Sequence, residues 1–342
     1  MTEAYRLPTH AEHTSFAPIR LGSVTIAFPV VQAALAGYSD WPMRVIASRL
    51  GAPFTLSEAM LARFVVQIGG KRAGRLVRPT GGGALCGAQL MGGDDPELGA
   101  AASRLAEAGF HAVDVNLACP VKKVLGRHRG GHLMGRPELA VDIVSRVRDA
   151  LPPEVPVTAK MRRGLDDSPE SRESFFAILD GVLNAGAAAV TVHGRTVRQR
   201  YEGRSSWQFL REVKQHAADA VILGSGDLFT AADCVGMLRQ TGVDGVAVAR
   251  GAIGNPWIFH QVRALALGRP CPQPSLSDQR EVMLEHFRLA EETYGPRRTG
   301  PIMRKFGIKY ARLHPQAAEV QAAFIGVRCQ EDWHRVLAQW YD

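Results

Sequence analysis

The chain has 342 residues, of which 46% are hydrophobic, and its 41 Lys plus Arg against 33 Asp plus Glu give a formal charge of +8. The hydrophobic content excludes wholesale disorder, and no run approaches the roughly 18 consecutive apolar residues that a membrane-spanning helix needs. The five cysteines form no Cys-x-x-Cys pair, so we expect no metal site and a reducing cytoplasm as the setting.

The chain begins with MTEAYRLPTHAEHTS, a polar segment without an apolar stretch, so we expect no secretory signal there. Eight short apolar runs follow, of the kind that is typical of strands buried on both faces of a parallel sheet. They occupy residues 24–35, 53–60, 84–90, 112–119, 155–161, 189–193, 220–224 and 245–249.

Segments with helical periodicity lie between these runs, for example at residues 96–108, 137–150, 172–185 and 231–240. The alternation predicts an α/β fold of the (β/α)₈ TIM-barrel type. No GxGxxG follows the first strand, which argues against a dinucleotide-binding open sheet. Because active sites of such barrels lie at the C-terminal strand ends, the polar residues that close each strand are the functional candidates.

The pattern changes after residue 259. A proline-rich linker at residues 269–275 precedes helices predicted at residues 278–294, 301–313, 316–325 and 330–339, with a strongly basic stretch between Arg297 and Arg312. We therefore predict a barrel domain, residues 1–262, and an all-helical domain, residues 263–342.

The fourth strand closes with Asn116-Leu117-Ala118-Cys119-Pro120, followed by Lys122 and Lys123. A cysteine in an electropositive loop at a barrel mouth can act as an acid or as a nucleophile. The alternative is an ordinary buried cysteine.

The fifth and sixth strands close with Lys160 and His193. A lysine at the end of an apolar strand is costly unless it meets an anion, and a flavin would supply that partner; the alternative is an exposed lysine. A lone histidine after an apolar strand is more often structural. The basic run that follows His193 includes Arg195, Arg198 and Tyr201, a combination that suits an RNA backbone and base stacking.

Small residues close three further strands. The loops Gly224-Ser225-Gly226-Asp227 and Ala249-Arg250 follow the seventh and eighth strands, where barrels commonly bind phosphate. Ala34-Leu35-Ala36 follows the first strand and would let a flat ring lie against the backbone. Gln89, in the third strand, offers an amide for the pyrimidine edge of a flavin, or one paired within the protein.

In this order the motifs resemble those of the tRNA-dihydrouridine synthase family, over roughly residues 26–313. The matching stretches are AALAGYSD, GAQLMG, NxxCP with KKV, KxRxG, VHGRT, GSGD and ARGAIGNPWIF, and in the helical part MRKFGIKY resembles the family's Arg-Lys-rich helix. The CPVKKV stretch resembles the bacterial subgroup that shares CPxKKV.

The resemblance implies a TIM barrel that uses FMN, with electrons from NADPH, to reduce the C5=C6 bond of particular uridines in tRNA, with Cys119 as the acid that protonates C5. We expect a monomer whose helical domain grips the tRNA. The implied FMN ligands are Ala34, Leu35, Ala36, Gln89, Lys160, His193, Gly224, Ser225, Gly226, Asp227, Ala249 and Arg250. The expected tRNA contacts are Asn116, Lys122, Lys123, Arg162, Arg195, Arg198, Arg304 and Lys305.

Two departures from the family pattern keep small or apolar character: Ala34-Leu35 replaces the usual Pro-Met, and Ser225 replaces the usual Asn. We expect FMN binding to survive both. One alternative is an FMN barrel oxidoreductase for a small molecule, of the dihydroorotate or dihydropyrimidine dehydrogenase type, which would not need the basic helical domain. The second is a noncatalytic flavin- or RNA-binding module, which would not need Cys119 and Lys160.

Overall fold

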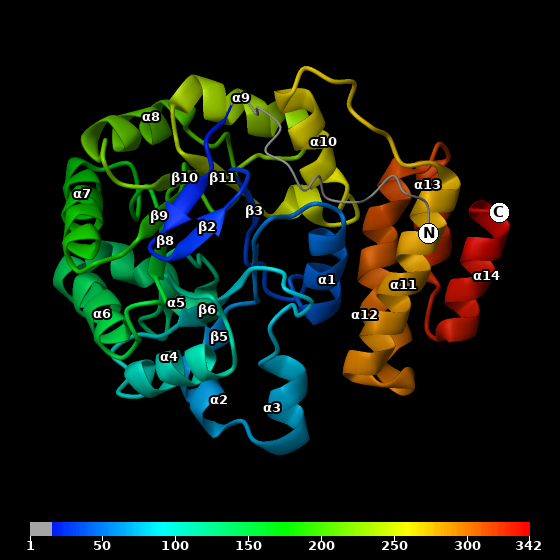
Figure 1. The fold of residues 1–342 in the computed structure, drawn as a ribbon, viewed down its shortest axis with the longest axis horizontal. Coiled ribbons are helices and arrows are strands. Elements are labelled where there is room, and N and C mark those ends of the chain that lie inside the picture. The colour runs from blue at the N-terminus through cyan, green and yellow to red at the C-terminus, as the bar shows by residue number, and fades with distance from the viewer. Residues whose placement is uncertain (1–15) are drawn as a thin grey trace.

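The computed structural model describes residues 16–342, so the prediction about the N-terminal 15 residues lies outside the described range. In this range eight parallel strands close into a barrel, which confirms the predicted (β/α)₈ fold (Figure 1). In barrel order they are β3 (Val30–Gln32), β4 (Thr55–Leu56), β6 (Cys86–Met91), β7 (Ala112–Asn116), β8 (Val157–Arg162), β9 (Ala189–His193), β10 (Ile222–Ser225) and β11 (Gly245–Val248).

The first apolar run was predicted as one strand and forms two. β2 (Val24–Ile26) pairs in antiparallel fashion with β1 (Ile19–Leu21), and only β3 joins the barrel. Pro29 lies between β2 and β3 and has no N–H for a ladder hydrogen bond, so one continuous strand is disfavoured. Ile19 and Ile26 are buried with Val31 and Ala247, and the hairpin therefore covers the N-terminal end of the barrel.

The second run also forms two short strands, β4 and β5 (Met60–Leu61), and both pair with β6. The ladder is interrupted at Ser57, whose Oγ accepts the N–H of Gln89 at 3.2 Å. A side chain thus replaces a carbonyl, and the chain turns away from the barrel between the two strands.

Helices surround the barrel, and those predicted around residues 96–108, 137–150, 172–185 and 231–240 are confirmed. α9 shows why they form where they do: Thr230 and Asp233 make a reciprocal capping box at its start, and Gly242, with φ 73°, ends it. The outer helices are α1 (Trp41–Arg49), α2 (Ala62–Gln67), α3 (Gly70–Leu76), α4 (Leu98–Glu107), α6 (Pro137–Asp149), α7 (Pro169–Asn184), α8 (Trp207–His216), α9 (Ala231–Thr241) and α10 (Ile258–Ala266).

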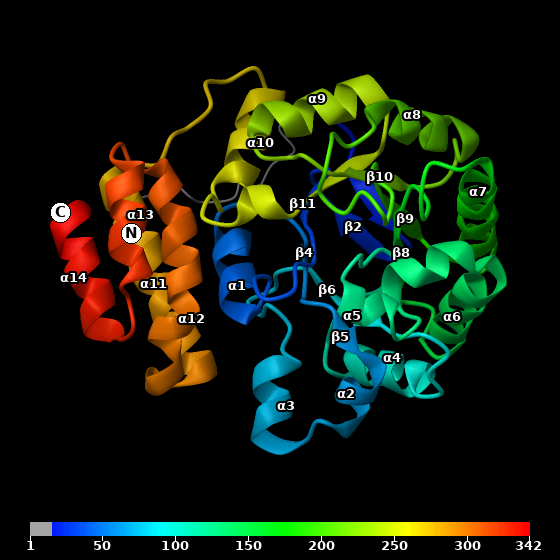
Figure 2. The same ribbon diagram turned by 180° about the vertical axis from the view of Figure 1, so that it is seen from behind.

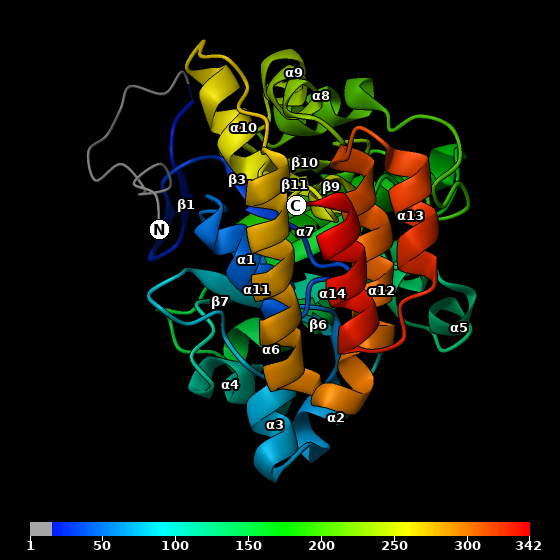
Figure 3. The same ribbon diagram turned by 90° about the vertical axis from the view of Figure 1, so that its right-hand side faces the viewer.

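The C-terminal helices form a second unit, which we call the helical unit. It packs on one side of the barrel, next to α1 (Figures 1 and 2). From the side it lies in front of the strands as a bundle of α11, α12, α13 and α14 (Figure 3). Their bounds are α11 (Leu276–Tyr294), α12 (Pro296–Tyr310), α13 (Ala317–Ile325) and α14 (Gln330–Trp340).

The start of the second helix in this unit was predicted wrongly. α12 begins at Pro296 and continues through Pro301, which had been taken as its first residue. Pro296 occupies the first turn, where a proline is tolerated, and Pro301 lies inside the helix. The link between the units runs from the end of α10 to the start of α11, so the predicted boundary at residues 262 and 263 falls inside α10.

The two units share a hydrophobic core, in which Phe306 and Tyr310 of α12 are buried together with Trp257 of the barrel. Gly307 allows α12 to approach α13 closely, since a Cβ there would lie 2.3 Å from the ring of Phe324. Within residues 16–342, no helix is long and apolar enough to cross a membrane.

Candidate active site

A cavity of about 420 Å³ opens at the C-terminal ends of the barrel strands. Residues from strands far apart in the sequence meet there, as expected for this fold. Of the predicted site residues, the structure places these in its lining: Ala34, Leu35, Ala36, Gln89, Asn116, Cys119, Lys160, Arg162, His193, Ser225, Gly226, Asp227, Ala249 and Arg250.

A chain of buried polar side chains supports the floor of the cavity. Gln89 donates from Nε2 to Asp114 at 2.7 Å and accepts from Asn116 at 2.6 Å, so its amide is paired within the protein. Thr158 donates to the other oxygen of Asp114 at 2.6 Å. Burial raises the pKa of Asp114. Sequence reasoning missed this carboxylate; its signal was an acidic residue inside the apolar run AVDVN.

Lys160 is the least satisfied group in the cavity. Its Nζ is shielded from solvent and has no hydrogen-bond partner among residues 16–342, which argues against an ordinary exposed lysine. Burial lowers the pKa of Lys160 to about 8, opposed by the charge of Asp114. An ammonium in this setting fits an electron-rich acceptor such as a flavin ring, which would complete its hydrogen bonding.

Cys119 lies in the wall of the cavity and is partly exposed, which argues against an ordinary buried cysteine. Its N–H donates to Oδ1 of Asn116 at 3.1 Å, and its carbonyl accepts from Gly131 at 3.0 Å. Gly130, with φ 56°, packs so closely that a Cβ there would lie 2.8 Å from the Cys119 Cβ. The backbone around the thiol is therefore fixed from both sides.

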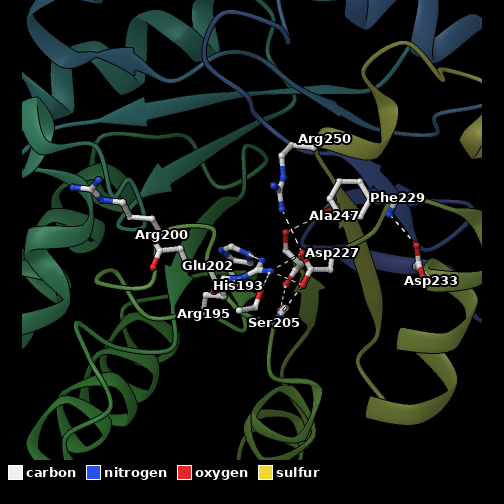
Figure 4. Close-up of polar contacts among 12 residues, drawn as sticks. His193, Arg195, Arg200, Glu202, Ser205, Asp227, Phe229, Asp233, Ala247 and Arg250 are labelled. Carbon is white, nitrogen blue, oxygen red and sulfur yellow. Dashed lines mark hydrogen bonds and ion pairs between the residues drawn. The ribbon is translucent and has the colours of Figure 1, made fainter. Parts of the chain in front are cut away.

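Asp227 organises the opposite side of the cavity, shown in Figure 4. Its carboxylate accepts two hydrogen bonds from Arg195, at 2.7 and 2.6 Å, and one from the N–H of Ser205 at 2.9 Å. Arg250 approaches it at 3.4 Å. Burial opposes ionisation of Asp227, but Arg195 and the other partners outweigh it and lower the pKa of the carboxyl.

His193 stays neutral beside these cations. Burial, reinforced by Lys160 and three arginines, lowers the pKa of His193 to about 2. Its Nε2 lies 3.4 Å from Nη1 of Arg195, so a neutral ring can accept there. Gly226 has φ 111°, and a Cβ at that position would lie 2.5 Å from the His193 ring. Glycine is thus required where this loop passes the histidine.

The mouth of the cavity combines cations with exposed rings. Arg250 lies between Tyr201 and Phe229, 4.8 and 4.9 Å from their centroids, and these rings are 52% and 44% exposed. Arg162 donates to the carbonyls of Ala118, Thr196 and Arg200, which fixes its guanidinium. Burial lowers the pKa of Arg162 to about 10, so it stays charged at neutral pH.

The remaining predicted site residues lie outside the cavity lining. Gly224 faces α9, where a Cβ would lie 2.6 Å from Met237 Sδ. Arg195 is buried against Asp227 and does not face solvent. The other five lie on the surface or between the units: Lys122 and Lys123 in α5 (Lys122–Leu125), Arg198 paired with Asp166, and Arg304 and Lys305 on α12.

Sequence reasoning also missed Ser205 and Glu58, whose polar contacts come from loops without a recognisable motif. Among the residues that the structure describes, there is no group of three or more His, Cys, Asp or Glu that could hold a metal ion.

Comparison with solved structures finds similar folds at low sequence identity. Morphinone reductase in complex with tetrahydroNAD superposes with a TM-score of 0.55 at 17% identity, covering 78% of this chain and 94% of that one. Histamine dehydrogenase from Rhizobium sp. 4-9 gives 0.59 at 15% identity, covering 81% of this chain and 51% of that one. At these identities the likeness concerns the fold.

Sequence comparison is more specific. The profile of the family described as Dihydrouridine synthase (Dus) matches residues 31–338. The tRNA-dihydrouridine synthase B of Xanthomonas campestris pv. campestris is 34% identical over 307 residues, 89% of this chain and 90% of the relative. A probable tRNA-dihydrouridine synthase of Rickettsia typhi is 30% identical over 306 residues, 89% of this chain and 92% of the relative. The chain belongs to the dihydrouridine synthase family.

Proposed function

We propose that the protein reduces the C5=C6 bond of specific uridines in tRNA to 5,6-dihydrouridine, in the cytoplasm, with FMN in the cavity and NADPH as the reductant. The observation that carries this proposal is the shielded Nζ of Lys160, in a cavity at the strand ends of a barrel of this family. Within the described part of the chain, this Nζ has no hydrogen-bond partner. A bound small molecule with a hydrogen-bond acceptor would provide that partner.

The cavity residues fit FMN in their chemistry. Lys160 offers donors to a flavin ring, and Ala34, Leu35 and Ala36 give the ring an apolar wall. Arg250 and the glycine-bearing loop at Gly226 suit the phosphate. When bound, FMN supplies the two electrons of the reduction, delivered to C6 as a hydride equivalent.

Cys119 is the proposed acid. As C6 gains the hydride equivalent, negative charge develops at C5, and the Cys119 thiol protonates it: the S–H bond breaks, the C5–H bond forms, and a thiolate remains until solvent reprotonates it. Asn116 and Gly131 fix the backbone of Cys119 and so restrict where the thiol can lie.

The surface around the cavity suits a polyanion. Lys122 and Lys123 are exposed on one side of the mouth, and Arg304 is exposed on α12 of the helical unit. We propose that residues 263–342 bind tRNA through its phosphates and shape, and that the target uridine leaves its stack to enter the cavity between these basic surfaces.

The test is reconstitution of the purified protein with FMN, followed by incubation with NADPH and an unmodified tRNA transcript. Nucleoside mass spectrometry is expected to find dihydrouridine only when FMN, reductant and protein are all present, and NADH in place of NADPH tests the choice of reductant. Reduction of free orotate or uracil with unchanged tRNA would favour the small-molecule enzyme. Binding of tRNA without product would favour the noncatalytic module.

A further inference from the structure

The turn after β3 connects the cavity to the helical unit. Leu35 and Ala36 line the cavity, and the next residue, Gly37, adopts φ 80°. Both backbone groups of Gly37 are bound by charged side chains from other parts of the chain. Its N–H donates to Oε1 of Glu58, in the loop between β4 and β5, and its carbonyl accepts from Nζ of Lys305, on α12.

The rest of the turn is closed by its own hydrogen bonds. The hydroxyl of Ser39 accepts the N–H of Leu35 at 2.8 Å, and the Leu35 carbonyl accepts from Tyr38 and Ser39, each at 2.9 Å. Asp40 then caps α1 through the N–H of Met43 and accepts from Tyr294 Oη, at 2.7 Å. Gly37 is therefore the residue at which side chains from outside the turn, Glu58 and Lys305, hold the middle of the turn.

Lys305 faces the barrel. Its Nζ lies 5.0 Å from the ring centroid of Tyr38 and 5.2 Å from that of Phe306, besides donating to Gly37. The preceding residue, Arg304, is exposed to solvent. Two neighbours in one basic motif thus face different surroundings, and Nζ of Lys305 is engaged with the turn after β3.

We propose that Lys305 and Glu58 are positioning residues for the cavity, so that the helical unit completes the flavin site. A cation on the carbonyl of Gly37 and an anion on its N–H hold the two peptide groups that flank this residue, which fixes the backbone that carries Leu35 and Ala36. This inference rests on the proposed function, because it takes FMN as the occupant of the cavity.

The experiment measures FMN affinity and tRNA affinity separately in Lys305→Met and its matched neighbour Arg304→Met. Apoprotein is titrated with FMN, followed by quenching of flavin fluorescence, and tRNA is titrated by filter binding. Lys305→Met is expected to weaken FMN binding about tenfold and to change the visible spectrum of bound flavin. Arg304→Met is expected to weaken tRNA binding while FMN affinity stays at the wild-type value.

Conservative variants separate positioning from damage to the fold. Lys305→Arg keeps a donor and Glu58→Gln keeps an acceptor, so both are expected to bind FMN better than Lys305→Met and Glu58→Ala do. The double variant Glu58→Ala/Lys305→Met is expected to lose less than the product of the single losses, since both side chains hold the backbone of one residue, Gly37.

Wild-type FMN affinity and spectrum in Lys305→Met would overturn this inference alone, as would a loss of tRNA affinity equal to that of Arg304→Met with FMN binding intact. A wild-type protein without FMN affinity would overturn the proposed function as well. If Lys305→Met does not fold, the FMN affinities of Lys305→Arg, Glu58→Gln and Glu58→Ala decide the matter. Tighter binding in Glu58→Gln than in Glu58→Ala, with Lys305→Arg near the wild type, would support the positioning role, and equal affinities in Glu58→Gln and Glu58→Ala would refute it.

Discussion

We call the contact between the barrel and the helical unit the seam. Charged side chains at the seam are paired with one another, whereas within the described range the ammonium of Lys160 in the strand-end cavity is not. At the seam, Arg78 pairs with Glu292 at 2.8 Å, and Arg49 pairs with Glu285. In the cavity, the Nζ of Lys160 is shielded from water and has no hydrogen-bond partner in the part of the chain that the structure describes.

This difference teaches that paired charges at the seam contribute to stability, whereas the unpaired charge in the cavity favours binding of a ligand. The charges of these two ion pairs are compensated by the folded chain itself, so they help to fix the helical unit against the barrel. The ammonium of Lys160 lowers stability until something else accepts its hydrogen bonds, because a desolvated charge without a partner is unfavourable. The cavity is therefore expected to gain more from a ligand than the seam would.

Replacement of Cys119 by Ala tests the chemistry of the cavity and has the largest expected effect. Dihydrouridine formation should fall by a factor of about 10²–10⁴, the usual contribution of a general acid, while FMN binding stays unchanged. The measurement is single-turnover product formation at a fixed flavin load. Cys271→Ala, in the link between the units, is the matched control, and equal turnover in both variants would show that Cys119 is not the acid.

Lys160→Met tests the uncompensated charge. The difference between the ordinary pKa of 10.5 and about 8 corresponds to about 3–4 kcal/mol, so the ligand-free variant should resist urea better at pH 7 by up to this amount, while its FMN affinity falls. The gain should shrink as the pH rises from 8 to 10.5, where the folded wild type no longer carries this charge.

Lys214→Met provides the contrast, because Lys214 Nζ donates to the carbonyls of Ala218 and Ala220 and pairs with Asp244. This variant should lose stability. A Lys160→Met protein that is also less stable than wild type would contradict the idea that this ammonium is uncompensated.

Asp40→Asn tests the buried carboxyl at the seam through its pH dependence. Burial raises the pKa of Asp40 from 3.8 to about 6, so the folded state keeps the proton to higher pH than the unfolded state does. Asp40 therefore contributes about 3 kcal/mol to the free energy of unfolding of the wild type below pH 4, and this contribution is lost as the pH rises through 6. The asparagine keeps an acceptor for Met43, so its urea stability should lack this decline; parallel profiles would refute the assignment.

Arg49→Met tests a surface pair of the seam and has the smallest expected effect. Exposed pairs contribute about 0.2–1 kcal/mol and are screened by salt, so the loss should be small in dilute buffer and vanish in about 1 M NaCl. Denaturant unfolding at two salt concentrations measures it. A loss that persists in high salt would mean that the aliphatic part of Arg49, and not its charge, contributes to the seam.

Much of the cavity could be predicted because each barrel strand ends with its own short motif. The TIM-barrel fold brings these strand ends together around one cavity, whose lining includes Gln89, Asn116, Cys119, Lys160 and His193. Arg195 and Lys305 were assigned to the tRNA surface because a basic residue in a basic run gives no sign of the direction it faces. The structure turns Arg195 toward Asp227 and Lys305 toward Gly37.

The sequence by itself determined the barrel, the helical unit and the motifs at the strand ends, since periodicity of two or 3.6 and local turn residues act over a few positions. Only the tertiary structure shows that Lys305 contacts Gly37 while its neighbour Arg304 is exposed. Only the tertiary structure likewise shows that Asp114 accepts a hydrogen bond from Gln89. These outcomes depend on contacts between segments far apart in the chain. Burial and electrostatic compensation are properties of those contacts, and no local pattern contains them.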